Sequence, residues 1–138
     1  MFNSNTNTFK HGIHPPENKD DTNGLPIRQF PFAPVVIIPM VQHIGAPSKI
    51  IVREGQEVMR GQLLAEADGY MSVPIHSPET GVIRKITRVP TISGQMVDGI
   101  YLEALPSASQ EVAEGIPTDL DASPEEILKA IQNAGIVG

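Results

Sequence analysis

A short phrase that occurs twice within residues 48–105 sets the strongest limit on how this chain folds. The copies lie at 55–66 and 94–103, and each reads Gly-Gln-x-Val, a gap, Gly, and an apolar run that ends at Glu. A repeated turn-and-strand unit is typical of two like halves that bury their apolar faces together. Because a segment with Pro and Gly at 74–83 crosses between the copies, we expect a small all-β sandwich or flattened barrel.

Composition narrows the class of protein. The 138 residues suffice for one domain with flanking segments. Aromatic residues make up only 4%, so the core must consist of Ile, Val, Leu, Met and Ala. The absence of Cys excludes disulfides and Cys-held iron–sulfur clusters within this chain. A net charge of −6 argues against a nucleic-acid-binding face, and no apolar run is long enough to span a membrane. We therefore expect a soluble, intracellular chain.

The sequence divides into four parts. Residues 1–34 are expected to form an extended arm, because repeated prolines disfavour both helix and central strand. Residues 35–105 form the β domain, and 106–122 form an acidic linker rich in small residues. Residues 123–138 contain a helix followed by the first residues of a Gly-rich loop. The arm offers three apolar anchors, namely Ile27, Phe30 and Phe32.

Signals for the helix are local and specific. Ser123 is placed as the N-cap, Glu126 stands three residues later as in a capping box, and Gly135 fits the position just after the helix. Its apolar stripe consists of Ile127, Leu128 and Ile131. A helix of about three turns is too short to be stable alone in water, so it requires a partner surface. Because the chain stops just after this helix, we infer that it is a fragment of a longer protein.

Histidines provide two hypotheses about chemistry. His11 and His14 have a spacing that suggests a metal pair, but Gly12 and Pro15 disfavour a helix that would align them, and no third ligand follows. We therefore predict no metal site. His43 and His76 are placed to face each other across the sandwich, which leaves a phosphoryl-carrier function open beside the simpler interpretation as ordinary histidines.

Two further segments are candidates for binding. A loop around Gly45 combines polar and apolar groups and is a candidate docking surface, although a loop that only packs on the arm is the simpler explanation. This candidate docking loop consists of Gln42, His43, Ile44, Gly45 and Ala46. Gly138 is the one residue placed to begin a phosphate-cradling loop after the helix.

The pattern of residues 55–83 resembles the barrel-sandwich hybrid fold of lipoyl and biotinyl carrier domains. These carriers attach their prosthetic group to a Lys at a hairpin tip. The corresponding tip here is Asp68-Gly69-Tyr70, which has no Lys. An amide-linked group requires an amine, so the resemblance implies the fold and disfavours a swinging-arm carrier.

A longer resemblance covers nearly the whole chain. The strings at 9–19, 42–47, 61–69 and 74–78 are similar to the N-terminal region of the RnfC family, the C subunit of the Rnf-type ion-translocating electron transport complex. The resemblance implies a barrel-sandwich hybrid here, and FMN and two [4Fe–4S] clusters in the remainder of a full-length protein of this family. It also implies electron transfer between NADH and ferredoxin, coupled to ion translocation, by a peripheral subunit on the cytoplasmic side of the bacterial inner membrane. Gly138 would begin the truncated flavin loop.

These inferences combine into one expectation. The chain alone is predicted to be a noncatalytic structural or docking module without a cofactor of its own. Its expected partners are the following flavin/NADH domain of the same polypeptide and the other subunits of the complex. The alternatives are a lipoyl/biotinyl-type or phosphoryl carrier domain, and the N-terminal part of the A subunit of the Na⁺-translocating NADH:quinone reductase, which shares the fold.

Overall fold

The computed structural model describes residues 16–28, 30–112 and 122–137. These residues fall into two units that separate between Phe30 and Pro31, and each unit is described by itself. In the first unit the described residues form no helix or strand, and their main feature is a turn in which the Lys19 carbonyl accepts hydrogen bonds from the backbone N–H groups of Thr22 and Asn23.

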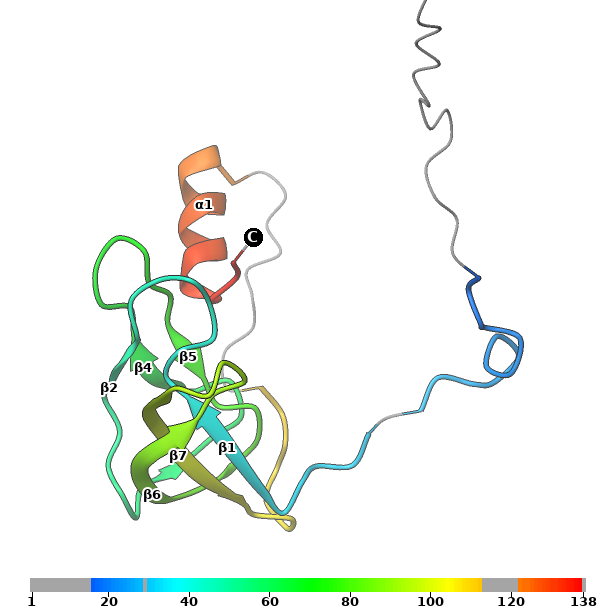
Figure 1. Cartoon of the computed structure of the whole chain (residues 1–138), viewed down its shortest axis with the longest axis horizontal. Helices are drawn as coiled ribbons and strands as arrows, with labels where there is room; N and C mark the ends of the chain where they lie inside the picture. The colour runs from blue at the N-terminus through cyan, green and yellow to red at the C-terminus, as the bar shows by residue number, and fades with distance from the viewer. Residues whose placement is uncertain (1–15, 29, 113–121, 138) are drawn as a thin grey trace, which may run out of the picture. The chain divides into compact units, whose positions relative to one another are not determined.

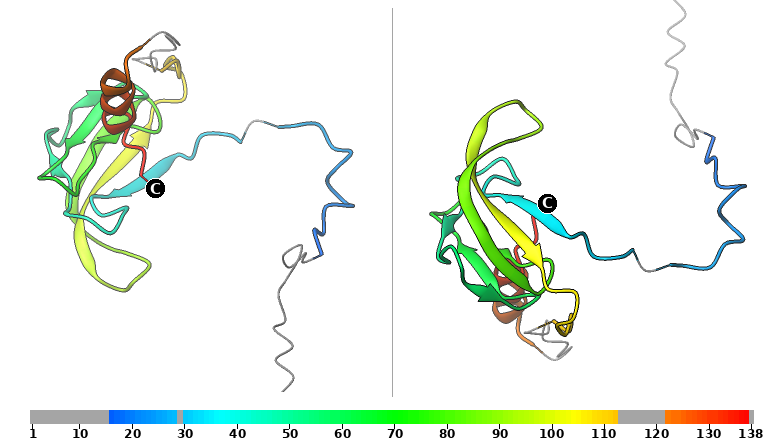
Figure 2. Two further views of the ribbon diagram at one scale, coloured as in Figure 1. Left: turned by 90° about the horizontal axis from the view of Figure 1, so that it is seen from above. Right: turned by 90° about the horizontal axis from the view of Figure 1, so that it is seen from below.

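The second unit contains two antiparallel sheets (Figures 1 and 2). The four-stranded sheet has the order β1-β7-β6-β3. Its strands are β1 (Val35–Pro39), β7 (Met96–Ala104), β6 (Gly81–Pro90) and β3 (Glu57–Val58). The long β6–β7 hairpin forms the centre of this sheet and is curved in both views of Figure 2. A register shift between Ile83 and Lys85 leaves Arg84 as an extra residue in β6, a bulge of the kind that bends a strand.

The three-stranded sheet is shorter and has the order β2-β4-β5. Its strands are β2 (Lys49–Ile50), β4 (Leu63–Glu66) and β5 (Ile75–His76). Strands β1 and β5 therefore each form the edge of a sheet. Residues of both strands line one opening between the sheets, which is called the seam. The mainly β architecture predicted from the sequence, a barrel-sandwich hybrid, is confirmed.

The core between the sheets is aliphatic, as the low aromatic content predicts. Leu64, Ile83, Ile100 and Leu102 are completely buried, and Met40 is 1% exposed. Replacing a side chain of this size and burial with Ala typically costs about 2–5 kcal/mol of unfolding free energy. The fold of this unit therefore depends mainly on a compact set of branched side chains drawn from both sheets.

The two copies of the repeat differ at their second glycine. Gly55 and Gly94, the first glycines, both have a φ of 80° and so occupy the left-handed region that favours glycine. Gly61 has a φ of 84° and lies in a turn between two short strands that belong to different sheets. Gly99 instead lies inside β7, where a side chain would collide with Val89. The prediction of two like halves therefore holds for the first turn of each copy and fails at the second glycine.

Helix α1 (Pro124–Asn133) begins and ends as the sequence predicts. The Glu126 backbone N–H donates to Ser123 Oγ, and the Ser123 N–H donates to Glu126 Oε2 at 2.8 Å, which completes the capping box. Gly135 has a φ of 72°, and its N–H donates to the Gln132 carbonyl. All ten helix residues are described and none is buried, so the apolar stripe predicted to need a partner is uncovered in this structure.

Residues just after β7 are held against the β domain rather than free. The Gln110 side chain accepts a hydrogen bond from the Thr80 N–H at 2.8 Å, and Arg60 donates to the Gln110 carbonyl. The Arg60 guanidinium also lies over the Phe32 ring, 5.4 Å from its centre. Phe32, one of the three predicted anchors, therefore contacts the β domain. The described part of the predicted 106–122 linker is therefore tied to the loop between β5 and β6.

Candidate functional site

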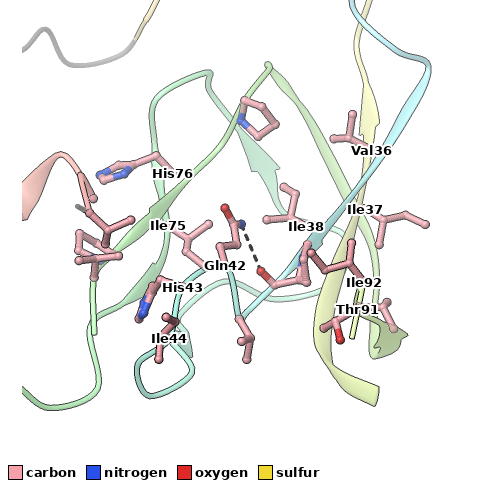
Figure 3. A pocket seen from close by; sticks show the side chains of 18 of the residues that line it. Val36, Ile37, Ile38, Gln42, His43, Ile44, Ile75, His76, Thr91 and Ile92 are labelled. Atoms are coloured by element: carbon pink, nitrogen blue, oxygen red, sulfur yellow. Dashed lines mark hydrogen bonds between the residues drawn. The ribbon is translucent and has the colours of Figure 1, made fainter. Parts of the chain in front are cut away.

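A groove of about 1190 Å³ lies in the seam between the edge strands β1 and β5 (Figure 3). Besides the strands, it is lined by the loop at 41–44, the turn of the β6–β7 hairpin and the residues after α1. Buried side chains of both sheets form its floor, among them Ile38 and Ile75, which point toward each other in Figure 3. The groove thus exposes the edge of the core that the two sheets leave open.

The rim of the groove is apolar and accessible. Ile44 is 98% exposed at the end of its loop, Ile92 is fully exposed in the β6–β7 turn, and Ile37 on β1 is half exposed. Val137, after the helix, is also half exposed. Large branched side chains grouped around an opening of this kind are typical of an interaction site.

The candidate docking loop, Gln42 to Ala46, lies on this rim and is held firmly in place. The Ala46 N–H donates to the Met71 carbonyl at 2.8 Å, and Ser72 Oγ donates to the Ala46 carbonyl at 3.1 Å. At Gly45 a Cβ atom would overlap the Met71 carbonyl oxygen, so this glycine allows close packing of the loop on the β4–β5 connection. The loop therefore presents Ile44 from a rigid support.

Both histidines singled out by the sequence, His43 and His76, line the same groove (Figure 3). His43 Nδ1 accepts a hydrogen bond from the Gly45 N–H at 2.9 Å, so in neutral His43 the proton is on Nε2. His43 Nε2 is buried without a hydrogen-bond partner. Phosphoryl transfer needs a free, accessible ring nitrogen, and His43 offers none in this arrangement, so the geometry at His43 gives the phosphoryl-carrier alternative no support.

The other residues singled out from the sequence form no site among the described residues. His11, His14 and Gly138 lie outside the described residues. Within the described part of the chain, no three His, Cys, Asp or Glu side chains are grouped so that they could hold a metal ion. Tyr70, at the hairpin tip where a carrier domain would need a Lys, is fully exposed. The tip therefore carries a phenol where a swinging arm requires an amine.

Sequence reasoning located the loop at 42–46 but missed the opposite wall of the groove. That wall contains Ile37 on β1 and Ile92 in the β6–β7 turn, which the sequence pattern did not connect with the loop. One signal was present: the apolar run 35–38 stands between Pro34 and Pro39, and prolines on both sides are typical of an edge strand.

The described residues include no helix with the length and apolar character needed to cross a membrane.

The chain is 39% identical over 134 residues to the C subunit of the Na(+)-translocating ferredoxin:NAD(+) oxidoreductase complex of Acetobacterium woodii, an alignment that covers 95% of this chain and 30% of the relative. It is 37% identical over 134 residues to the C subunit of the proton-translocating ferredoxin:NAD(+) oxidoreductase complex of Clostridium ljungdahlii, covering 95% and 29%.

A third relative is the C subunit of the ion-translocating oxidoreductase complex of Haemophilus influenzae strain PittEE, 33% identical over 132 residues, covering 94% of this chain and 20% of the relative. The chain thus spans less than a third of the length of these relatives. Residues 7–105 match the family described as the RnfC barrel sandwich hybrid domain, which is well over half of the chain and agrees with the two-sheet fold and the resemblance found in the sequence. The chain belongs to the RnfC barrel sandwich hybrid domain family.

Proposed function

We propose that this chain acts as a noncatalytic docking module of a longer subunit in an ion-translocating electron transport complex. The observation that carries the proposal is the apolar rim of the groove, where a rigid loop holds Ile44 almost fully exposed. A large exposed apolar side chain is costly to leave in water, and fixing it in advance lowers the entropy lost when it is buried by a partner. The site is therefore built for contact with another protein surface.

The names of the relatives support the proposed setting. Two are subunits of ferredoxin:NAD(+) oxidoreductase complexes and the third belongs to an ion-translocating oxidoreductase complex, and this chain aligns to 20–30% of their length. We infer that FMN and two [4Fe–4S] clusters, which the resemblance implies for a full-length protein, belong to the remainder of the longer subunit. This chain contains no Cys that could hold the clusters. The module would pack on the flavin/NADH domain or on neighbouring subunits, on the cytoplasmic side of the membrane, and hold the redox centres at fixed separations.

One test addresses the docking surface. In a longer subunit that contains this segment, Ile44→Asp should reduce co-purification with the other subunits or retention of the flavin domain's fold, because a charge would have to be buried in an apolar contact. Met59→Asp is the matched control, because Met59 is half exposed and lies outside the groove. Normal assembly of the Ile44→Asp subunit would contradict the proposed docking role.

A second test addresses the absence of catalysis in the module. The 138-residue chain is titrated with FMN and with NADH and followed by isothermal calorimetry. We expect no saturable heat with either compound. A dissociation constant in the micromolar range would show that the chain itself holds a cofactor site and would overturn the proposal.

A further inference from the structure

The outer edge of β1 has a defined hydrogen-bonding pattern. In the pairing with β7, the Ala104 N–H donates to the Pro34 carbonyl and the Met40 N–H donates to the Asp98 carbonyl. Backbone groups alternate in direction along an antiparallel pair, so the even-numbered residues of β1 face β7. The N–H and C=O groups of Val35 and Ile37 consequently face away from the sheet.

This free edge is short, and one of its two ends is closed. The next outward-facing residue, Pro39, has no N–H, and its carbonyl accepts a hydrogen bond from Gln42 Nε2 at 3.2 Å (Figure 3). At the other end the edge is limited by the start of β1 at Val35. Since β1 is an edge strand of its sheet, the outward groups of Val35 and Ile37 have no strand beside them among the described residues. The edge thus offers two donors and two acceptors within three residues.

The groove next to this edge selects against charge. Among the described residues that line it, none is Asp, Glu, Lys or Arg, although the chain contains 16 acidic and 10 basic residues. Its volume of about 1190 Å³ exceeds the ~300–1,000 Å³ of typical small-molecule sites. An uncharged, elongated occupant fits these properties better than an ionic or compact one.

We propose that an extended, uncharged segment of a separate polypeptide binds here as an added strand, antiparallel to β1. Its backbone pairs with Val35 and Ile37, and its alternate side chains enter the groove toward Ile38 and Ile75. Strand addition of this kind obtains affinity from main-chain hydrogen bonds and specificity from the pockets that receive every second side chain. The inference rests on the proposed docking function and names the kind of partner segment that the groove accepts.

The experiment uses the ¹⁵N-labelled 138-residue chain and a capped probe peptide, acetyl-Thr-Val-Thr-Ile-Thr-amide. Added peptide should produce saturable chemical-shift changes at the amides of Val35 and Ile37 and slow their hydrogen exchange. Two N-methylated probes provide the control for backbone pairing, one methylated at Val and Ile and the other at the three Thr residues. Only alternate peptide amides can face β1, so one probe should lose affinity about tenfold or more relative to the other.

Variants of the protein add an independent check. Ile37→Pro removes the outward N–H but no hydrogen bond to β7, so it should abolish binding, whereas Ile37→Thr keeps the donor and should bind. Met59→Thr, outside the groove, should leave binding unchanged. If Ile37→Pro prevents folding, the N-methylated probes still decide the question on the unaltered chain.

Three results would overturn the inference. The first is no saturable binding, and the second is equal loss of affinity with both methylated probes. The third is protection of Val35 and Ile37 that rises with protein concentration without peptide, because this would identify a second copy as the occupant. If the peptide experiment fails but the Ile44→Asp subunit assembles poorly, strand addition is wrong and the proposed docking function still holds.

Discussion

Gly99→Ala tests whether the second glycine of the repeat is required for packing rather than for backbone conformation. A Cβ at Gly99 would lie 2.9 Å from Val89 Cγ1 and 3.2 Å from Val89 Cβ, and closer still to Cγ2. Carbon atoms in favourable contact are about 3.5–4.0 Å apart. Val89 is 1% exposed and branched at Cβ, so it has little freedom to rotate away.

The magnitude follows from two opposing effects. Overpacking a buried site costs about 1–3 kcal/mol, whereas replacing Gly by Ala recovers about 0.4–1 kcal/mol from the entropy of the unfolded chain. Gly99→Ala should therefore destabilise the chain by about 1–2 kcal/mol. Val89→Ala removes both Cγ atoms, so Gly99→Ala introduced in that background should cost close to nothing, a coupling of about 1–2 kcal/mol.

Urea unfolding of the parent, both single variants and the double variant measures this coupling, provided that the slope of unfolding free energy against urea concentration is the same for all four proteins. Gly55→Ala is the contrasting control, because Gly55 has a φ of 80° and open space where a Cβ would lie. Its cost comes from the backbone, so Val89→Ala should not relieve it. Additive costs for Gly99→Ala and Val89→Ala would refute the packing argument.

Three further changes test other parts of the structure. Burial raises the pKa of Glu79, whose Oε1 has no hydrogen-bond partner. Its stabilising contribution is therefore complete below the ordinary pKa of 4.5 and is lost as pH rises through the raised pKa; Glu79→Gln should flatten this decline in thermal stability above pH 4.5, and parallel pH profiles of the two proteins would contradict it. Ser123→Ala should remove the capping box and lower the stability of α1 by about 1 kcal/mol, which would be measured as faster amide hydrogen exchange in the first turn of the helix. Ser107→Ala, outside the helix, is the control. Gln110→Ala should remove the hydrogen bond that the Gln110 side chain accepts from the Thr80 N–H, measured as faster exchange of the Thr80 amide, and unchanged exchange would count against this bond.

Local signals in the sequence were sufficient where a single segment determines the outcome. The ends of α1 were predicted because the capping residues and Gly135 act within one turn of the helix. The first glycines of the repeat were likewise predicted to be turns, and both adopt the same left-handed conformation. Gly99 was misjudged because its role depends on Val89, a neighbour from another strand that no local pattern identifies.

The groove could not be predicted for the same reason, since an edge exists only once the strand order is known. The sequence indicated a short strand between two prolines, but only the pairing of β1 with β7 shows which of its backbone groups face outward. The loop at 42–46 was identified from composition alone. Its function as one rim of a groove depends on the seam between β1 and β5, which brings together residues far apart in the chain.

An open strand edge beside exposed Ile side chains would ordinarily promote nonspecific association between chains. Here the edge is restricted to Val35 and Ile37, because β1 begins at Val35 and because Pro39, at its other end, has no N–H and a carbonyl that already accepts a hydrogen bond from Gln42. A partner strand therefore gains hydrogen bonds over one short stretch of β1, and extending the pairing past Ile37 to Pro39 gains none. Restriction of the edge, rather than complete closure of it, is what a specific docking site requires, and it connects the proline-flanked run in the sequence to the proposed function of the module.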